Sequence, residues 1–346
     1  MTYALGQPPL TGYPTDVPTF YESLASTVEK KEPVALGIIT EVRGSSPQKV
    51  GAKALFFEDG RIIGTMGGGC LEAEIQDRAR QALRTGKSET FDLVLDHDFG
   101  WDDGLVCGGR VSGIILPRIL SAAPIWNELA KRQNKRIWGV TMDDHMMWAD
   151  TSEASGLDWR YRETVAPPCT LWIAGAGHIA QAVAPLALNL DFAVTVFDDR
   201  PALANHEFFP HEVTLRVGDW KEILDDSLSE HGTFGLIVTR GHRHDALVLR
   251  HWINSDFAFL GMIGSRRKAR TIREHFLAEK IGSEDALSRL SCPVGVNIAA
   301  QTVPEIAVSI IAQYINERAS YVTQQNSSIP SPDPERKPAR LVSAVD

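Results

Sequence analysis

The chain is poor in cysteine and carries no excess of positive charge. Its 346 residues include four cysteines, Cys70, Cys107, Cys169 and Cys292, which lie far apart without any C-x-x-C pairing. This spacing excludes a disulfide framework or a zinc knuckle and favours reduced thiols in a cytosol. Because the net charge is −9 at pH 7, we expect no broad binding to nucleic acid or to an anionic membrane.

Long hydrophobic runs are also missing. No apolar run approaches the ~18 residues needed to cross a bilayer, so we expect no membrane span. Residues 1–20 contain no basic start followed by an apolar stretch, so we expect no secretory signal and a cytoplasmic protein. What the chain does have is a hydrophobic content of 43% and a length typical of two domains with buried cores.

The most informative motif lies at mid-chain, where the apolar run LWIA leads into glycines and then a helix. Gly175-x-Gly177-x-x-Ala180 is the alanine-ended form of the dinucleotide fingerprint. The glycines permit a tight turn close to a phosphate, which the amides and dipole of the helix start then hold. A second apolar strand at 193–197 ends at Asp198, which suits an acid that binds a ribose hydroxyl.

Strands and helices alternate from this motif onward, as in a parallel sheet. The predicted strands are 171–174, 193–197, 212–217, 234–239 and 257–263, and the predicted helices are 178–190, 246–254 and 266–278. A capping box, Thr302-x-x-Glu305, precedes an apolar helix at 306–315. The pattern predicts an α/β fold whose C-terminal domain is a Rossmann-like parallel sheet.

A smaller α+β domain is predicted before it. Its elements are helices at 19–30 and 71–83 and strands at 34–42, 52–57, 61–64, 90–95 and 110–116. The predicted organisation is an α+β domain over 19–120, a linker with a hairpin over 121–168, a Rossmann-like domain over 169–320 and a disordered tail over 321–346.

Two glycine–cysteine loops in the N-terminal half are candidates for ligand contact. Gly67, Gly68 and Gly69 permit close approach of the backbone, and Cys70 follows at a helix start that stabilises a thiolate. Such a sulfur could hold a metal, carry a persulfide or touch a ligand. A tight turn with a small buried cysteine explains the pattern equally well. The second loop, GLVCGG, contains Cys107, and a shared pocket would require that the two loops meet.

An anion loop is a further interpretation for the run Arg43-Gly-Ser-Ser-Pro47 with nearby Lys49 and Lys53. For Arg43 alone, a solvated charge at a strand end is the simpler explanation.

Polar residues follow three of the predicted Rossmann strands, where open α/β sheets bind ligands. They include His178, His242 and the run Ser265-Arg266-Arg267. Ser265 is predicted to cap a helix whose arginines supply charge for a phosphate, although a solvated helix face also explains the run.

Two further histidine patterns need a choice of interpretation. His242-x-His244-Asp245, expected in the extended segment before a helix, resembles a metal site, but no H-E-x-x-H spacing accompanies the two histidines, which favours ligand or loop contacts over zinc. The dipole at its helix start favours a neutral His178.

Taken in order, these motifs resemble the xanthine dehydrogenase accessory protein family (XdhC/CoxI). The matching runs are RGSSP from Arg43, GGGCLE from Gly67, GLVCGG before Arg110, GAGH from Gly175, DDR from Asp198, GMIGSRRK before Ala269 and CPVG from Cys292. The resemblance extends from about Val34 to Ile315.

The resemblance implies a chaperone for the molybdenum cofactor rather than a catalyst. Family members bind molybdopterin or its dinucleotide form as cargo and protect its sulfurated form with a cysteine desulfurase-type protein. They then help insert the cofactor into molybdenum hydroxylases. For this chain it implies contact of Cys70 with molybdenum or its sulfur ligand, and we also expect a homodimer.

Two other interpretations remain open. The fingerprint and Asp198 also fit an NAD(P)-dependent oxidoreductase, although no substrate-domain acid–base set is evident. A sulfur-transfer enzyme that uses Cys70 as a persulfide carrier is the third.

Overall fold

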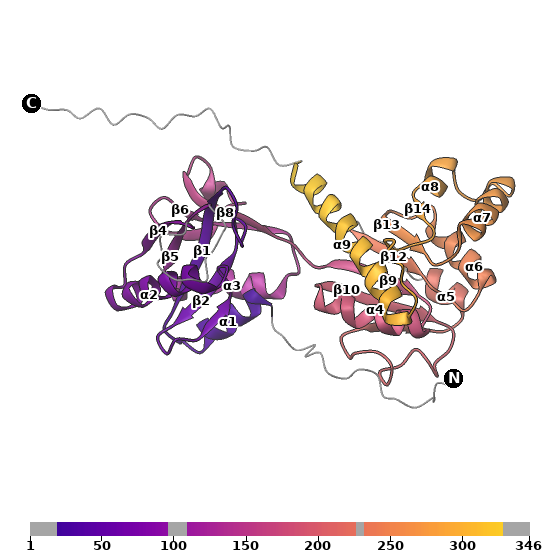
Figure 1. Ribbon diagram of the computed structural model, residues 1–346, viewed down its shortest axis with the longest axis horizontal. Coiled ribbons are helices and arrows are strands. Elements are labelled where there is room, and N and C mark those ends of the chain that lie inside the picture. Colours follow the sequence, from indigo (N-terminus) through magenta and orange to yellow (C-terminus); the bar gives the residue numbers. More distant parts are fainter. Residues whose placement is uncertain (1–18, 96–108, 226–231, 328–346) are drawn as a thin grey trace, which may run out of the picture. The chain divides into compact units, whose positions relative to one another are not determined.

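The computed structural model describes residues 19–95, 109–225 and 232–327. These residues fall into two compact units, one within Asp16–Pro167 and one within Pro168–Asp346 (Figure 1). Each unit has its own sheets, helices and buried core. Among the described helices, none combines the length and apolarity needed to cross a membrane.

The N-terminal unit is built on a five-stranded antiparallel sheet with the order β3-β2-β1-β5-β4. Its strands are β1 (Val34–Arg43), β2 (Lys53–Phe57), β3 (Ile62–Gly64), β4 (Glu89–Val94) and β5 (Arg110–Leu116). Alternate residues of β1 point to opposite faces, so that Leu36 and Ile38 enter one core cluster while Ala35 and Ile39 enter the other. The sheet is therefore buried on both faces.

Helix α2 (Gly69–Thr85) covers one of these faces with Ile75 and Ala79. Helix α1 (Phe20–Glu29) packs with α3 (Ala123–Lys131) against the other. A capping box between Thr19 and Glu22 begins α1.

Residues 121–168 differ from the linker that the sequence suggested. They include α3 and a three-stranded sheet, β7-β6-β8, made of β6 (Arg136–Thr141), β7 (Met146–Trp148) and β8 (Trp159–Val165). The predicted hairpin is present as the β6–β7 pair. The segment belongs to the N-terminal unit because Trp126, Trp138 and Tyr161 are buried in the core beside β1.

The C-terminal unit is a parallel six-stranded sheet with the order β11-β10-β9-β12-β13-β14. The strands are β9 (Cys169–Ala174), β10 (Phe192–Asp198), β11 (Thr214–Val217), β12 (Thr233–Ile237), β13 (Phe257–Met262) and β14 (Leu290–Ser291). In chain order this is 3-2-1-4-5-6, the Rossmann arrangement. The predicted fold class is confirmed.

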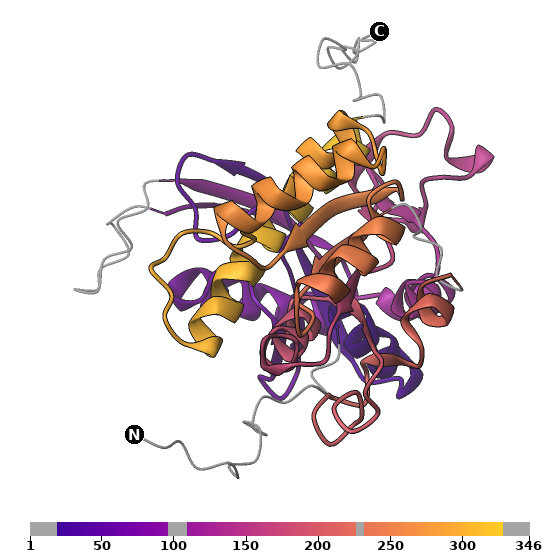
Figure 2. The same ribbon diagram turned by 90° about the vertical axis from the view of Figure 1, so that its right-hand side faces the viewer.

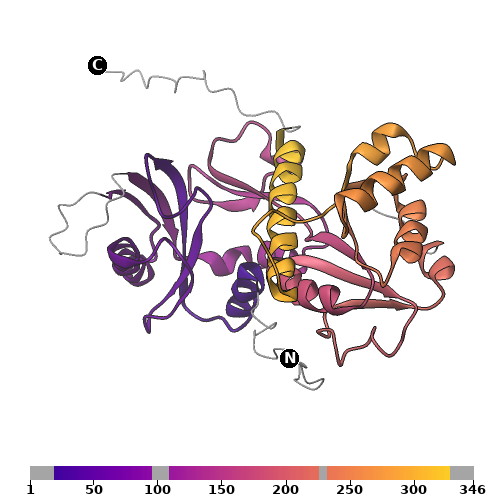
Figure 3. The ribbon, with the colours of Figure 1, turned by 45° about the vertical axis from the view of Figure 1, so that its right-hand side comes forward.

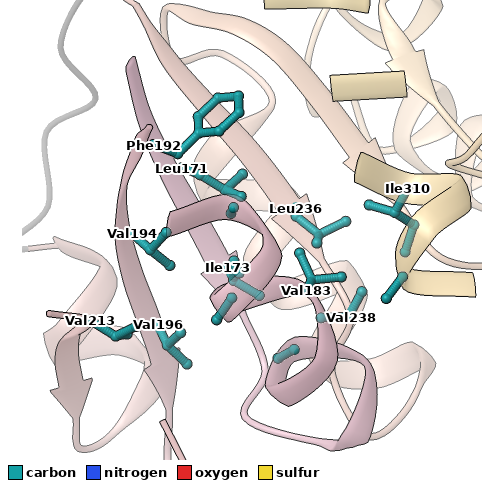
Figure 4. Close-up of a cluster of buried hydrophobic side chains, with 14 of the residues drawn as sticks. Leu171, Ile173, Val183, Phe192, Val194, Val196, Val213, Leu236, Val238 and Ile310 are labelled. Carbon is teal, nitrogen blue, oxygen red and sulfur yellow. The ribbon is translucent and has the colours of Figure 1, made fainter. Parts of the chain in front are cut away.

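Helices cover both faces of this sheet (Figure 3). On one face lie α4 (His178–Asn189) and α9 (Val303–Ser327). Side chains of the central strands, including Ile173 and Leu236, pack there against Val183 of α4 and Ile310 of α9 (Figure 4). The opposite face carries α5 (Trp220–Asp225), α6 (His242–Trp252), α7 (Arg266–Ala278) and α8 (Glu284–Ser288), with α6 and α7 side by side (Figure 2).

Two helix boundaries differ from the sequence prediction by four residues or more. Helix α6 begins at His242, four residues before the predicted start, so the His242–His244 pair is helical and not extended. Helix α9 begins at the predicted Thr302–Glu305 capping box but continues to Ser327. Beyond residue 315, the helix packs on the sheet through Tyr321, which contacts Phe234, and Arg318, which lies over the ring of Phe192. Residues 328–346 of the predicted tail lie outside the described residues.

Candidate functional site

The loop between β9 and α4 has the geometry of a phosphate-binding turn. Gly175 has a φ of +115°, and a Cβ at this position would lie 2.5 Å from the carbonyl oxygen of Val238. Gly177 precedes α4, and a Cβ there would meet nothing within 4 Å. The first glycine is thus required by packing against β12, whereas the second leaves the approach to the helix open. His178 is the first residue of α4 and is exposed.

Asp198 holds this loop from the end of β10. Its carboxylate accepts hydrogen bonds from the amide of Ala176 (2.7 Å) and from the amide and guanidinium of Arg200 (2.8–2.9 Å). Burial disfavours the charged form, but the bonds from Arg200 and Ala176 outweigh it and hold the pKa of Asp198 below its ordinary value. Its side chain is 1% exposed, and neighbouring Asp199 is 24% exposed. The hydrogen-bonding capacity of Asp198 is therefore used within the loop and its flanks.

Asp199 is bound by Arg240, which follows β12. The guanidinium makes a bidentate pair with the carboxylate (2.7 and 2.9 Å) and also contacts Nε2 of His244 (3.0 Å). His242 is exposed at the first position of α6. Within the described part of the chain, no three His, Cys, Asp or Glu side chains are placed to share a metal ion.

The basic run at the start of α7 is divided between two roles. Lys268 donates to the buried Asp245 (2.5 Å) and to the carbonyl of Ile263 (2.9 Å), and Asp245 also accepts from Thr239 (2.7 Å). This lysine therefore ties α7 to α6 and is not available as a free cation.

Arg266 and Arg267 are exposed, and neither has an ion-pair partner among the described residues. Ser265 caps α7 by accepting from the amide of Lys268 (3.2 Å), which confirms the predicted cap. The two arginines thus stand at a helix start, and no carboxylate of the described segments compensates their charges.

The loops after β9, β12, β13 and β14 lie against one another at the carboxyl edge of the sheet. A Cβ on Gly175 would meet Val238 and Thr239, and a Cβ on Gly264 would lie 3.2 Å from Sγ of Cys292. This edge includes the switch point between β9 and β12, where the strand order reverses. The structure thus gathers the predicted polar strand ends of this unit at one edge.

A groove between α5 and α6 was not predicted from the sequence. Its volume is about 640 Å³, and its walls include Trp220, Lys221, Arg243 and His244. Asp199 lies in its wall too. The sequence signal for it was weak, because α5 has only six residues and was not recognised as a helix.

In the N-terminal unit, the structure brings together segments that the sequence could not place. A Cβ on Gly67 would lie 2.9 Å from Cγ of Pro47, and a Cβ on Gly109 would clash with the carbonyl oxygen of Ser45. The Arg43–Pro47 run therefore contacts the Gly67 loop and the end of the second glycine–cysteine loop. Cys107 lies outside the described residues, and Cys70 is described only as the second residue of α2.

The triple glycine before Cys70 has an unusual backbone. Gly67, Gly68 and Gly69 have φ values of +122°, +75° and +58°, a run that side chains rarely adopt. A Cβ on Gly68 or Gly69 would meet no described residue within 4 Å, so this part of the loop is open toward the described part of the chain. Glycine is needed here for conformation, and the open space permits a ligand to approach the backbone.

Two of the three cations predicted to form an anion loop, Arg43 and Lys53, are already paired with carboxylates. Arg43 lies beside Glu41 (2.6 Å). Lys53 binds Glu163 (2.8 Å) and the carbonyl of Gly51 (2.6 Å), and its side chain is 8% exposed. Tyr21 also donates to Glu163. Burial is the larger cause that raises the pKa of the Tyr21 phenol, and the negative charge of Glu163 is the second. Lys53 therefore stabilises the unit from within.

Known families match both halves of the chain. The XdhC Rossmann domain matches residues 171–314, and the XdhC and CoxI family matches residues 27–94. The uncharacterized protein YqeB of Escherichia coli is 30% identical over 85% of this chain, which spans only 45% of YqeB.

Two relatives align over most of their own length. A probable xanthine dehydrogenase subunit of Bacillus subtilis is 24% identical over 86% of this chain and 97% of its own. The molybdenum cofactor insertion chaperone PaoD of Escherichia coli is 25% identical over 81% of this chain and 82% of its own.

A solved structure shares the fold. A crystal structure described as a xanthine dehydrogenase from Bacillus halodurans matches with a TM-score of 0.74 and 24% identity, over 87% of this chain and 96% of that one. The two family matches follow one another in the order of the two structural units and together cover more than half of the chain. The chain belongs to the XdhC and CoxI family.

Proposed function

We propose that this protein binds the molybdenum cofactor as cargo and assists its insertion into a xanthine dehydrogenase-type molybdenum hydroxylase. The observation that carries the proposal is that one chain combines a phosphate-binding Rossmann edge with a glycine–cysteine loop cluster. The cofactor has matching chemistry, because it carries an anionic tail at one end and a sulfur-rich metal centre at the other. The name of PaoD supports the choice of cargo.

The Rossmann edge is proposed to hold the phosphate or dinucleotide tail. Its open Gly177 and the exposed arginines of α7 supply the close approach and the positive charge that a phosphate needs. The residues assigned to this role are Gly175, Gly177, His178, Asp198, His242, Ser265, Arg266 and Arg267. In this set Asp198 acts by holding the loop through Ala176.

The N-terminal loops are proposed to shield the sulfur-rich end. Gly67, Gly68 and Gly69 border open space, and Cys70 follows at the start of α2, where the helix dipole favours a thiolate. Cys70 is assigned the contact to molybdenum or its sulfur ligand, and Cys107 is the second candidate. A cysteine desulfurase-type protein would supply the sulfur. This protein would act in the cytoplasm as a homodimer that serves the hydroxylase.

The fingerprint also supports a second candidate function, an NAD(P)-dependent oxidoreductase. The loop geometry at Gly175 and Gly177 fits a dinucleotide pyrophosphate as well as a pterin phosphate. A sulfur-transfer role for Cys70 is the third, and it predicts a persulfide on this thiol in the purified protein.

The experiment that separates these functions is purification from cells that make molybdopterin. Bound pterin is measured by its fluorescence after oxidation, bound nicotinamide by mass spectrometry, and hydroxylase activity with and without co-expression of the protein. We expect bound pterin and a co-expression-dependent rise in hydroxylase activity. Absence of pterin together with unchanged hydroxylase activity would overturn the proposal.

A further inference from the structure

We propose that Glu72 is a positioning residue that fixes the Gly67–Gly69 backbone for cargo binding, an inference that rests on the proposed function. A single oxygen of its carboxylate, Oε2, accepts from the amides of Met66 (3.0 Å) and Gly68 (3.3 Å) and from the hydroxyl of Thr65 (3.1 Å). Glu72 is the fourth residue of α2, so its side chain folds back over the start of its own helix.

The hydroxyl of Thr65 extends this arrangement by one bond. It donates to Glu72 and accepts from the amide of Gly67 (3.1 Å). Every amide from Met66 to Gly68 therefore has an acceptor, either Glu72 of α2 or Thr65 of the loop. The arrangement is related to a capping box, with glycine in place of the residue that usually caps the helix with its own side chain.

A stabilising group is needed because the triple glycine does not order itself. Glycine loses more backbone freedom on folding than any other residue, and three in succession have positive φ values here. On one side Gly67 rests on Pro47, whereas a Cβ on Gly68 or Gly69 would contact none of the residues that the structure describes. Glu72 supplies the restriction from the helix side and leaves the open side of the loop to the cargo.

A simple dipole interaction explains less of the structure. An acid anywhere in the first turn would satisfy the helix dipole. Glu74 is also near the start of α2, but it pairs with Arg78 one turn later (2.8 Å), and no bond joins it to the loop. The two acids share a helix and a charge, so Glu74→Ala is a matched control for Glu72→Ala.

The test combines two measurements on the full chain, purified from molybdopterin-producing cells. Amide hydrogen exchange at residues 66–69 reports the loop, and pterin bound per protein reports the cargo. Glu72→Ala is expected to raise the exchange rate of Met66 and Gly68 about tenfold or more and to lower the bound pterin. Glu74→Ala is expected to match the wild type in both.

Glu72→Gln distinguishes positioning by hydrogen bonds from an effect of charge. All three bonds end on one oxygen, which a glutamine amide can replace, so we expect this variant to restore both loop protection and bound pterin. If Glu72→Gln behaves like Glu72→Ala, or if Glu72→Ala exchanges like the wild type, the proposal is overturned.

A second variant keeps the test valid if Glu72→Ala does not fold. Thr65→Val removes only the hydroxyl that joins Glu72 to Gly67, and we expect faster exchange at Gly67 with the thermal transition preserved. An unchanged exchange rate at the amide of Gly67 would count against the proposed arrangement. A wild-type protein without pterin would refute the proposed function. The hydrogen-exchange rates test separately whether Glu72 fixes the loop.

Discussion

The amide of Ala176 donates to the carboxylate of Asp198 over 2.7 Å, which joins the glycine fingerprint to the end of the neighbouring strand. The same carboxylate accepts from Arg200. A comparable relationship exists in the N-terminal unit between Gly68 and Glu72. In both units, a glycine loop is held in place by one carboxylate that lies beyond the loop in the chain.

Replacing Asp198 by Asn is expected to destabilise the C-terminal unit by about 1.5–3 kcal/mol at pH 7, since charge-assisted hydrogen bonds are lost. The pKa of Asp198 is lowered in the fold, so its contribution is present above the unfolded pKa of about 3.9 and is lost as pH falls through the folded value. Denaturant unfolding measured at pH 7 and in steps below pH 4 should show that the difference in the free energy of unfolding between wild type and variant decreases as the pH falls.

Asp199→Asn is the control for this measurement. Its partner Arg240 is exposed, and such surface pairs contribute about 0–1 kcal/mol. An Asp198 variant as stable as this control would show that the Ala176 bond does not hold the loop.

The double variant Arg266→Ala and Arg267→Ala should weaken binding of the cofactor's phosphate end. Each lost charge-assisted contact is worth about 1.5–3 kcal/mol, and the salt dependence of binding should flatten because fewer charges take part. Titration of the purified protein with molybdopterin at two salt concentrations measures both effects.

Arg273→Ala is the control, because it removes one positive charge from the same helix at a residue that is paired with Glu284. We expect this variant to bind like the wild type. Unchanged affinity in the double variant would remove the two arginines from the site.

The protein should not turn over nicotinamide. No acid–base set for hydride transfer is evident beside the fingerprint among the described residues, and Asp198 is engaged with Ala176 and Arg200. The measurement is the binding of NADH and NADPH and their oxidation in the presence of small carbonyl compounds. Tight binding accompanied by oxidation would place the oxidoreductase function first.

Cys70→Ser should reduce activation of the client hydroxylase while leaving folding and phosphate-end binding largely intact. The reason is the position of Cys70 after an open glycine loop and at the start of α2. Hydroxylase activity after co-expression and the pterin content of each purified variant are the measurements.

Cys169→Ser is the control, because this cysteine begins β9 and lies within the Rossmann unit. It should change neither activity nor pterin content. Full activation by the Cys70→Ser variant would mean that the thiol has only a packing role and that the glycines alone account for the loop.

Local signals in the sequence determined most of the secondary structure. Strand β5 (Arg110–Leu116) and helix α7 (Arg266–Ala278) have the predicted bounds. Their signals, an apolar run for β5 and the Ser265 cap for α7, involve only residues that are neighbours in the chain. The Rossmann order followed from strands, helices and the fingerprint in succession.

Only the tertiary structure decided which side chains the motifs use. Lys268 reads as part of a basic run, but a crossover brings it to Asp245, which is 23 residues earlier in the chain. Helix α6 begins at His242, and in its first turn Asp245 is held between Thr239 and Lys268. The spacing of residues within one helix or strand does not predict which side chains of other elements they will contact.

The glycine loops show the same division. The sequence determined that the backbone at Gly67–Gly69 and Gly175 is free to adopt conformations closed to other residues. The fold decided which conformation is kept, through packing of Gly67 on Pro47 and of Gly175 on Val238. Glycine supplies backbone freedom locally, and it is restricted by contacts with distant segments and, at Gly67–Gly69, by the hydrogen bonds of Glu72.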